Sequence, residues 1–165
     1  MKTFFILLTF LLVLVGCSSN NAFDNFKMDK DQQRSVSSLQ TTKIVSSDEK
    51  INGIFSAIYL NEVYPESFND GEYFFVYMYL KKKKKMYNPK ELLPTGLNLR
   101  LNSKLAVKIK ELPRENKFSH LVSMNNNWHK YYLVAFMPQE TRSLSLVLEN
   151  DPSFSAELKY QKAEQ

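Results

Sequence analysis

The segment YFFVYMYL, residues 73–80, decides the fold. Apolar side chains occupy every second position, and residues with this spacing point to one face of a β-strand. That face consists of Phe74, Val76, Met78 and Leu80. The pattern predicts a strand that packs one wholly apolar face against a hydrophobic core.

The same alternation recurs before and after this segment. The further runs are Ile54, Ser56, Ile58, Leu60; Leu97, Leu99, Leu101; Leu105, Val107, Ile109; Leu144, Leu146, Leu148; and Ala156, Leu158, Tyr160. Turn signals lie between the runs, among them Asn52-Gly53 and Asn69-Asp70-Gly71. About seven short strands without a long helical pattern predict an all-β domain, a single antiparallel β-sandwich.

The order of these features resembles that of immunoglobulin-like domains in small bacterial envelope lipoproteins. The shared features are a long aromatic strand, a central Leu-x-Leu-x-Leu strand, Trp128 ahead of residues 131–137, and a terminal hairpin. The resemblance implies an immunoglobulin-like β-sandwich over residues 43–165. The chain departs from antibody domains because it lacks their cysteine pair and because Trp128 comes late in the sequence.

Residues 1–16 have the three parts of an export signal: a basic start at Lys2, an apolar stretch over residues 4–15, and a small residue, Gly16, at the end. The apolar stretch has about 12 residues, whereas a membrane span needs about 20. Residues 14–17, Leu-Val-Gly-Cys, resemble the lipobox of bacterial lipoproteins. The resemblance implies cleavage before Cys17 and attachment to a membrane through acyl chains on this residue.

Residues 17–42 are predicted to form the lipidated cysteine and a flexible tether, because residues 18–42 are rich in Ser, Asn, Gln and Asp with scattered apolar positions. A short helix around residues 24–35 is the alternative. Ser18 and Ser19 follow the cysteine where inner-membrane lipoproteins tend to have Asp, so the resemblance favours the outer membrane. The sequence does not determine whether the domain faces the periplasm or the exterior.

Catalytic and cofactor motifs are absent from the sequence. Beyond residue 16 the glycines are Gly53, Gly71 and Gly96, too widely spaced for a phosphate-binding loop. His120, Met124 and His129 are a weak candidate for a soft-metal site, and surface or turn positions are the favoured interpretation of the two histidines. We therefore predict a protein that is not an enzyme and needs no cofactor.

Five consecutive lysines follow the predicted strand at residues 73–80: Lys81, Lys82, Lys83, Lys84 and Lys85, here called the lysine run. Cleavage after residue 16 removes Lys2 from 22 basic residues, leaving 21 against 17 acidic ones, a formal charge of +4. Without the lysine run this charge would be −1. The run is expected either to contact an acidic envelope component or to form a solvated hairpin that protects a sheet edge.

The other face of the predicted strand at residues 73–80 is aromatic: it consists of Tyr73, Phe75, Tyr77 and Tyr79, here called the aromatic stripe. Four exposed aromatic side chains are unfavourable in water, so they are expected to be covered or to bind a partner. The candidates for cover are residues 86–94, strands carrying Tyr59, Tyr131 or Tyr132, and a second subunit.

Together these features favour a non-catalytic interaction module, anchored at Cys17, whose aromatic stripe and lysine run contact an envelope protein or an acidic envelope polymer. The alternative is a small-ligand or lipid-binding lipoprotein with an apolar pocket between the sheets. Nucleic acid is not an expected partner of an exported lipoprotein, and the oligomeric state is not indicated.

Overall fold

A computed structural model describes residues 29–91, 96–122, 126–150 and 154–163. The elements in chain order are α2 (Lys30–Ser38), β1 (Leu39–Ser46), β2 (Ile51–Tyr59), α3 (Leu60–Val63), β3 (Glu72–Leu80), β4 (Asn98–Leu101), β5 (Lys104–Leu105), β6 (Lys108–Leu112), the 3₁₀ turn η2 (Ser119–Leu121), β7 (Lys130–Phe136), β8 (Ser143–Asn150) and β9 (Phe154–Gln161). The signal peptide and Cys17 lie outside the described residues, so their assignment stays a prediction.

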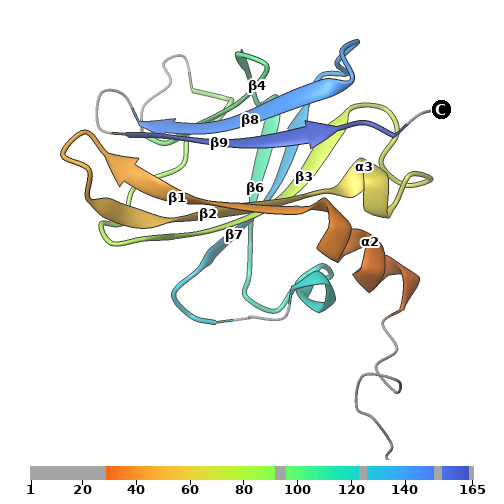
Figure 1. Cartoon of the computed structure of the whole chain (residues 1–165), viewed down its shortest axis with the longest axis horizontal. Coiled ribbons are helices and arrows are strands. Elements are labelled where there is room, and N and C mark those ends of the chain that lie inside the picture. Colours follow the sequence, from red (N-terminus) through yellow and green to blue (C-terminus); the bar gives the residue numbers. More distant parts are fainter. Residues whose placement is uncertain (1–28, 92–95, 123–125, 151–153, 164–165) are drawn as a thin grey trace, which may run out of the picture.

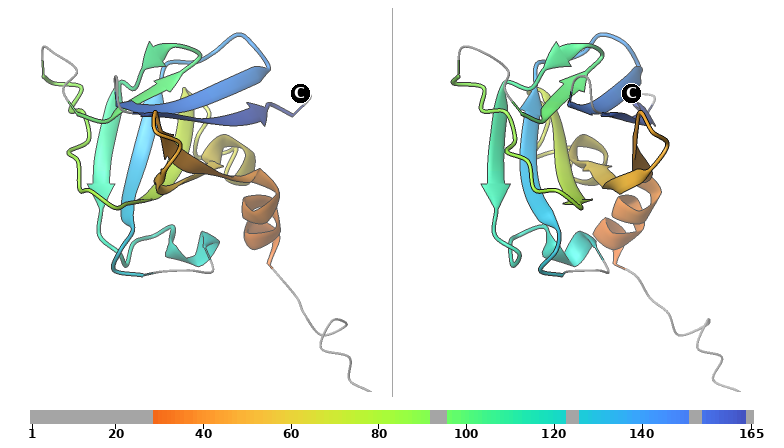
Figure 2. Two further views of the ribbon diagram at one scale, coloured as in Figure 1. Left: turned by 60° about the vertical axis from the view of Figure 1, so that its left-hand side comes forward. Right: turned by 90° about the vertical axis from the view of Figure 1, so that its left-hand side faces the viewer.

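The strands form one antiparallel sheet in the order β5-β4-β8-β9-β1-β2-β3-β7-β6. The sheet curls into a half-barrel, and Figures 1 and 2 show β8 and β9 lying over β2, β3 and β7. Residues between β5 and β6 connect the two ends of the sheet. The Ala106 amide donates to the Leu99 carbonyl at 3.1 Å, and the Val107 amide donates to the Ala135 carbonyl at 2.9 Å.

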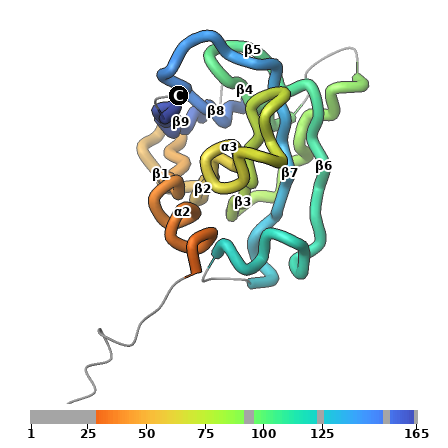
Figure 3. The backbone as a smooth tube through the Cα atoms, turned by 90° about the vertical axis from the view of Figure 1, so that its right-hand side faces the viewer, coloured from red at the N-terminus to blue at the C-terminus, as the bar shows by residue number. Residues whose placement is uncertain are grey.

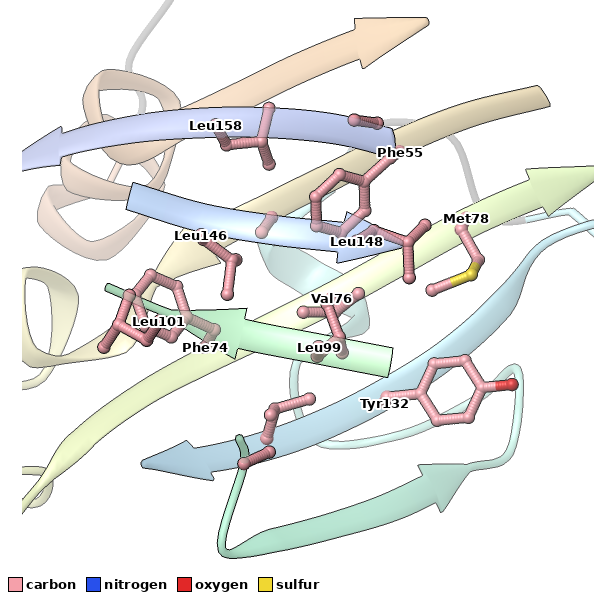
Figure 4. Close-up of a cluster of buried hydrophobic side chains, with 14 of the residues drawn as sticks. Phe55, Phe74, Val76, Met78, Leu99, Leu101, Tyr132, Leu146, Leu148 and Leu158 are labelled. Atoms are coloured by element: carbon pink, nitrogen blue, oxygen red, sulfur yellow. The ribbon is translucent and has the colours of Figure 1, made fainter. Parts of the chain in front are cut away.

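The concave face of the sheet holds the main hydrophobic core. Phe74, Val76 and Met78 of β3 are at most 2% exposed, as the apolar face of residues 73–80 predicts. They share one cluster with Phe55 of β2, with Leu99 and Leu101 of β4, and with Leu146, Leu148 and Leu158 of β8 and β9. Figure 4 shows these side chains between the two halves of the curled sheet. Side chains from both halves thus fill one core.

The all-β, antiparallel prediction is confirmed, whereas the immunoglobulin-like sandwich of about seven strands is not. Nine strands form one continuous sheet, because β1 pairs with both β2 and β9 and so connects the two halves. One additional strand is β1 itself. The other arises because the predicted strand at residues 105–109 divides at Val107, which is 51% exposed, into β5 on one edge and β6 on the other.

The described residues begin at Asp29, within the stretch that the sequence assigns to the tether. The Asp29 carboxylate caps α2 by accepting the Gln32 amide hydrogen at 2.8 Å. Two small polar side chains of α2 are buried: the Ser35 hydroxyl donates to the Leu121 carbonyl at 3.3 Å, and the Ser38 hydroxyl to the Tyr59 carbonyl at 3.3 Å. Residues 30–42 are therefore helix and strand, in partial agreement with the alternative of a short helix.

Gly53 lies inside β2, although Asn52-Gly53 is a turn signal. A β-carbon at this position would be 2.1 Å from the Tyr79 carbonyl oxygen of β3, so the absence of a side chain permits the two backbones to approach. We expect Gly53→Ala to lower the free energy of unfolding by about 1–3 kcal/mol, measured by denaturant titration. Ile51→Ala, at an exposed position on the same strand, should change it by less than about 1 kcal/mol. Equal effects would contradict this explanation of Gly53.

Candidate functional site

The aromatic stripe lies on the convex face of β3 and is covered at one end by the chain itself. Phe75 is 0% exposed and packs against Phe118, with ring centroids 5.3 Å apart, and against Tyr131 at 6.2 Å. The same cluster includes Leu60 and Val63 of α3, Leu121 at the end of η2, and Val122 directly after it. Phe75 is therefore a core residue and not part of an interaction surface.

Of the three tyrosines considered as cover from the sequence, Tyr131 belongs to this cluster, and its strand β7 and the strand β2 that carries Tyr59 add Leu133 and Ile58. Tyr59 and Tyr132 belong to the core on the concave face, as does Met86 of the segment that follows the lysine run. The cover comes mainly from residues 113–122 and from α3, with α2 packed beside them. Figure 3 shows these elements together at one end of the domain.

The three tyrosines of the stripe have different environments. The Tyr73 hydroxyl donates to Asp70 at 2.6 Å, and its ring lies 5.0 Å from that of Phe68. Tyr77 is half-buried, with its ring 5.7 Å from His129. Tyr79 is farthest from α3 and lines an open cleft. Only this end of the stripe is brought together with the lysine run.

The lysine run is a crossing segment and not a hairpin. At its start the Lys81 amide donates to the Asn52 carbonyl at 2.8 Å, which continues the pairing of β3 with β2. At its end the Leu97 amide donates to the Lys85 carbonyl at 2.9 Å, beside a parallel bridge between Met86 and Leu97. The run therefore passes from the end of β3 to the start of β4, across the open side of the half-barrel. Because β3 pairs on both sides, the run does not protect an edge of that strand.

The run forms one wall of a cleft of about 590 Å³, here called the lysine–tryptophan cleft. Its lining residues are Met78, Tyr79, Leu80, Lys81, Lys83, Lys84, Leu97, Asn127, Trp128, His129, Lys130 and Tyr132. They come from the end of β3, the start of β7 and the two connecting segments. The cleft lies at the opposite end of the sheet from α3, because β2 enters α3 beside the start of β3.

Trp128 is the largest exposed apolar side chain of the described residues, at 78% exposure. A compact turn holds its backbone: the Asn126 side-chain oxygen accepts the amide hydrogens of Trp128 at 3.0 Å and His129 at 3.1 Å. The Asn126 amide in turn donates to the Tyr131 hydroxyl at 3.2 Å. The indole is thus presented to solvent by a fixed turn.

The positive charge of the cleft comes from its lysines. Among the described residues, Lys81 and Lys83 have no carboxylate at ion-pair distance, whereas Lys130 pairs with Glu111. The Lys84 ammonium lies 5.3 Å from the centre of the Phe154 ring. Burial lowers the pKa of His129, and burial and Glu111 raise the pKa of Tyr132 to about 12, so both are uncharged at neutral pH.

The structure does not bring the histidines together as metal ligands. The Tyr64 hydroxyl lies 2.7 Å from Nε2 of His120, whereas His129 contacts the rings of Tyr77 and Tyr131. Met124 lies outside the described residues. Within the described ranges, no group of three His, Cys, Asp or Glu side chains is placed to hold a metal ion.

Trp128 and Lys130 were not among the site residues predicted from the sequence. A signal for Trp128 is present, because a large apolar residue directly after three consecutive asparagines, Asn125 to Asn127, occupies a turn. Lys130 has no such signal, since its place beside the lysine run depends on the pairing of β7 with β3.

Comparison of the chain with protein-family models, with curated proteins and with solved structures finds no match. Within the described ranges, the helices are all too short or too polar to span a membrane.

Proposed function

We propose that the chain is an envelope lipoprotein, anchored through Cys17, whose β-domain is a non-catalytic interaction module that binds an acidic envelope component at the lysine–tryptophan cleft. The observation that supports this most directly is the path of the lysine run. The backbone of the run is hydrogen-bonded to neighbouring segments at both ends, and Lys81, Lys83 and Lys84 of the run line one face of an open cleft. Fixed positive charges without carboxylate partners attract anionic groups.

The alternative of an apolar pocket between the sheets has less support. One continuous cluster of side chains fills the concave face of the sheet. Four clefts formed by described residues open at the surface and have charged side chains in their linings. These linings suit ligands with charged groups better than wholly apolar ones.

The double variant Lys81→Gln with Lys83→Gln tests the proposal. We expect it to weaken binding at low salt by about 30-fold, because each lysine near an anionic surface contributes about 1 kcal/mol. The measurement is a titration of the chain from residue 18 onward, which lacks Cys17, with inorganic polyphosphate and with phosphatidylglycerol-containing vesicles. Added salt should weaken binding of the unmodified chain more than that of the variant.

The matched control is Lys104→Gln with Lys108→Gln, which makes the same change in charge at exposed positions outside the cleft. This control should lose less than about threefold in affinity. The proposal fails if neither probe binds the unmodified chain, or if both double variants weaken binding equally. Thermal unfolding of each variant verifies that it is folded.

A further inference from the structure

The end of the domain that carries the lysine–tryptophan cleft is also apolar. Ile54 pairs with Tyr79 in the β2–β3 register and is 42% exposed. Val45 and Ile51, which pair with each other on the adjacent hairpin, are 39% and 44% exposed. With Trp128, these side chains place several large apolar groups beside the lysine run. Such a concentration at one end of a domain is typical of an interaction surface.

An acidic polymer in water accounts for the lysines but not for the apolar side chains. The polymer's anionic groups would satisfy the ammonium groups and leave the exposed indole in water. The interface of an anionic bilayer satisfies both, because it presents phosphates to the lysines and an apolar boundary to the indole. Tryptophan is enriched at this boundary, since its ring is apolar and its N–H donates a hydrogen bond.

Resting on the proposed function, we propose that the acidic component is an anionic lipid surface and that Trp128 is the side chain that enters it. Lys81 and Lys83 contact lipid phosphates, while Trp128 and Ile54 lie at the boundary between headgroups and acyl chains. In this orientation, the ends of the strands that carry the lysine–tryptophan cleft contact the bilayer. Figure 1 shows α2, where the described chain begins, at the other end of the sheet. β3 has nine residues, so the two ends are about 30 Å apart.

Trp128 is the single tryptophan of the chain, so its fluorescence reports the proposed contact directly. We expect its emission to shift to shorter wavelength when the chain from residue 18 onward is titrated with phosphatidylglycerol-containing vesicles. Brominated acyl chains in these vesicles should quench it. Vesicles of phosphatidylcholine alone, and inorganic polyphosphate, should leave the wavelength unchanged.

Trp128→Ala, followed by vesicle co-sedimentation, tests the contribution of the indole with the charge unchanged. We expect about tenfold weaker binding to phosphatidylglycerol-containing vesicles. Met137→Ala is the matched control, because Met137 is 60% exposed and follows β7 at the opposite end of the sheet. It should bind like the unmodified chain.

The outcomes separate this inference from the proposed function. If polyphosphate binds the chain and vesicles do not, the lipid inference is overturned and the acidic-component proposal stands. If vesicles bind without a shift in Trp128 emission, the entry of Trp128 into the bilayer is overturned. If neither probe binds, both are overturned. Equal binding by Trp128→Ala and the unmodified chain would also overturn the role of the indole.

Discussion

Lys162→Met should lower the free energy of unfolding by about 3 kcal/mol or more at neutral pH. The Lys162 ammonium lies 2.5 Å from the carboxylate of Glu72, whose side chain is 4% exposed. The same carboxylate accepts the Tyr59 hydroxyl at 2.5 Å and the Gln139 amide at 2.9 Å. Removing the ammonium leaves a buried negative charge without its cation, and this is more unfavourable than the loss of a surface ion pair.

The destabilisation should depend on pH. Burial raises the pKa of Glu72, but hydrogen bonds from Lys162, Tyr59 and the Gln139 amide outweigh it, so the net pKa lies below the ordinary value of 4.5. A carboxyl whose pKa is lower in the folded state stabilises the fold above its unfolded pKa, and it loses this contribution as pH falls through the folded pKa. The difference between the unmodified chain and Lys162→Met should therefore be full at pH 7 and shrink below about pH 4.5.

Lys159→Met is the matched control, because Lys159 lies on β9 three residues away with a side chain that is 78% exposed. This change should alter the free energy of unfolding by less than about 0.5 kcal/mol at every pH. Denaturant titrations at pH 7 and at pH 3 measure both variants. A loss at Lys162 that is equally large at both pH values would contradict the role assigned to Glu72.

The strands with a regular apolar alternation could be predicted from the sequence, whereas β1 could not. Four consecutive residues of this strand, Gln40, Thr41, Thr42 and Lys43, are polar, and only Ile44 is fully buried. Its strand conformation depends on pairing with β2 and with β9. β9 is distant in the sequence, and the sequence pattern does not identify either strand as a neighbour of β1. Pairing of this kind overrides local propensity.

The sequence pattern also does not predict that the sheet curls into a half-barrel. A sandwich and a curled sheet both place one apolar face against a core, so the alternation in β3, β8 and β9 is the same for either. What distinguishes them here is the position of β1 between β2 and β9. The same argument applies to the path of the lysine run, because five identical residues do not indicate that Met86 pairs with Leu97.

For the candidate site, the sequence identified the lysine run and the aromatic stripe but not which part of the stripe is covered. Alternation places Tyr73, Phe75, Tyr77 and Tyr79 on one face without distinguishing them. The difference arises from Phe118, which lies about forty residues later and packs on Phe75. Long-range packing therefore divides a uniform sequence pattern into a core position and a surface position.

Phe75→Ala should lower the free energy of unfolding by about 3–5 kcal/mol, the second large effect that we expect. The side chain is wholly buried between β3 and residues 113–122, and its ring contacts those of Phe118, Tyr77 and Tyr131. Truncation would remove these contacts and leave a cavity that the surrounding elements fill only in part. Denaturant titration measures the change, and vesicle binding measured where the variant is folded should be unaffected.

Tyr79→Ala is the opposite case on the same strand face. Tyr79 is part-exposed and lines the lysine–tryptophan cleft, so its truncation should change the free energy of unfolding by less than about 1.5 kcal/mol while weakening vesicle binding. The two variants together locate the boundary between core and surface along β3. If Phe75→Ala were mild and Tyr79→Ala severe, the cover of the stripe would lie at the cleft end, and the surface proposed for binding would be part of the core.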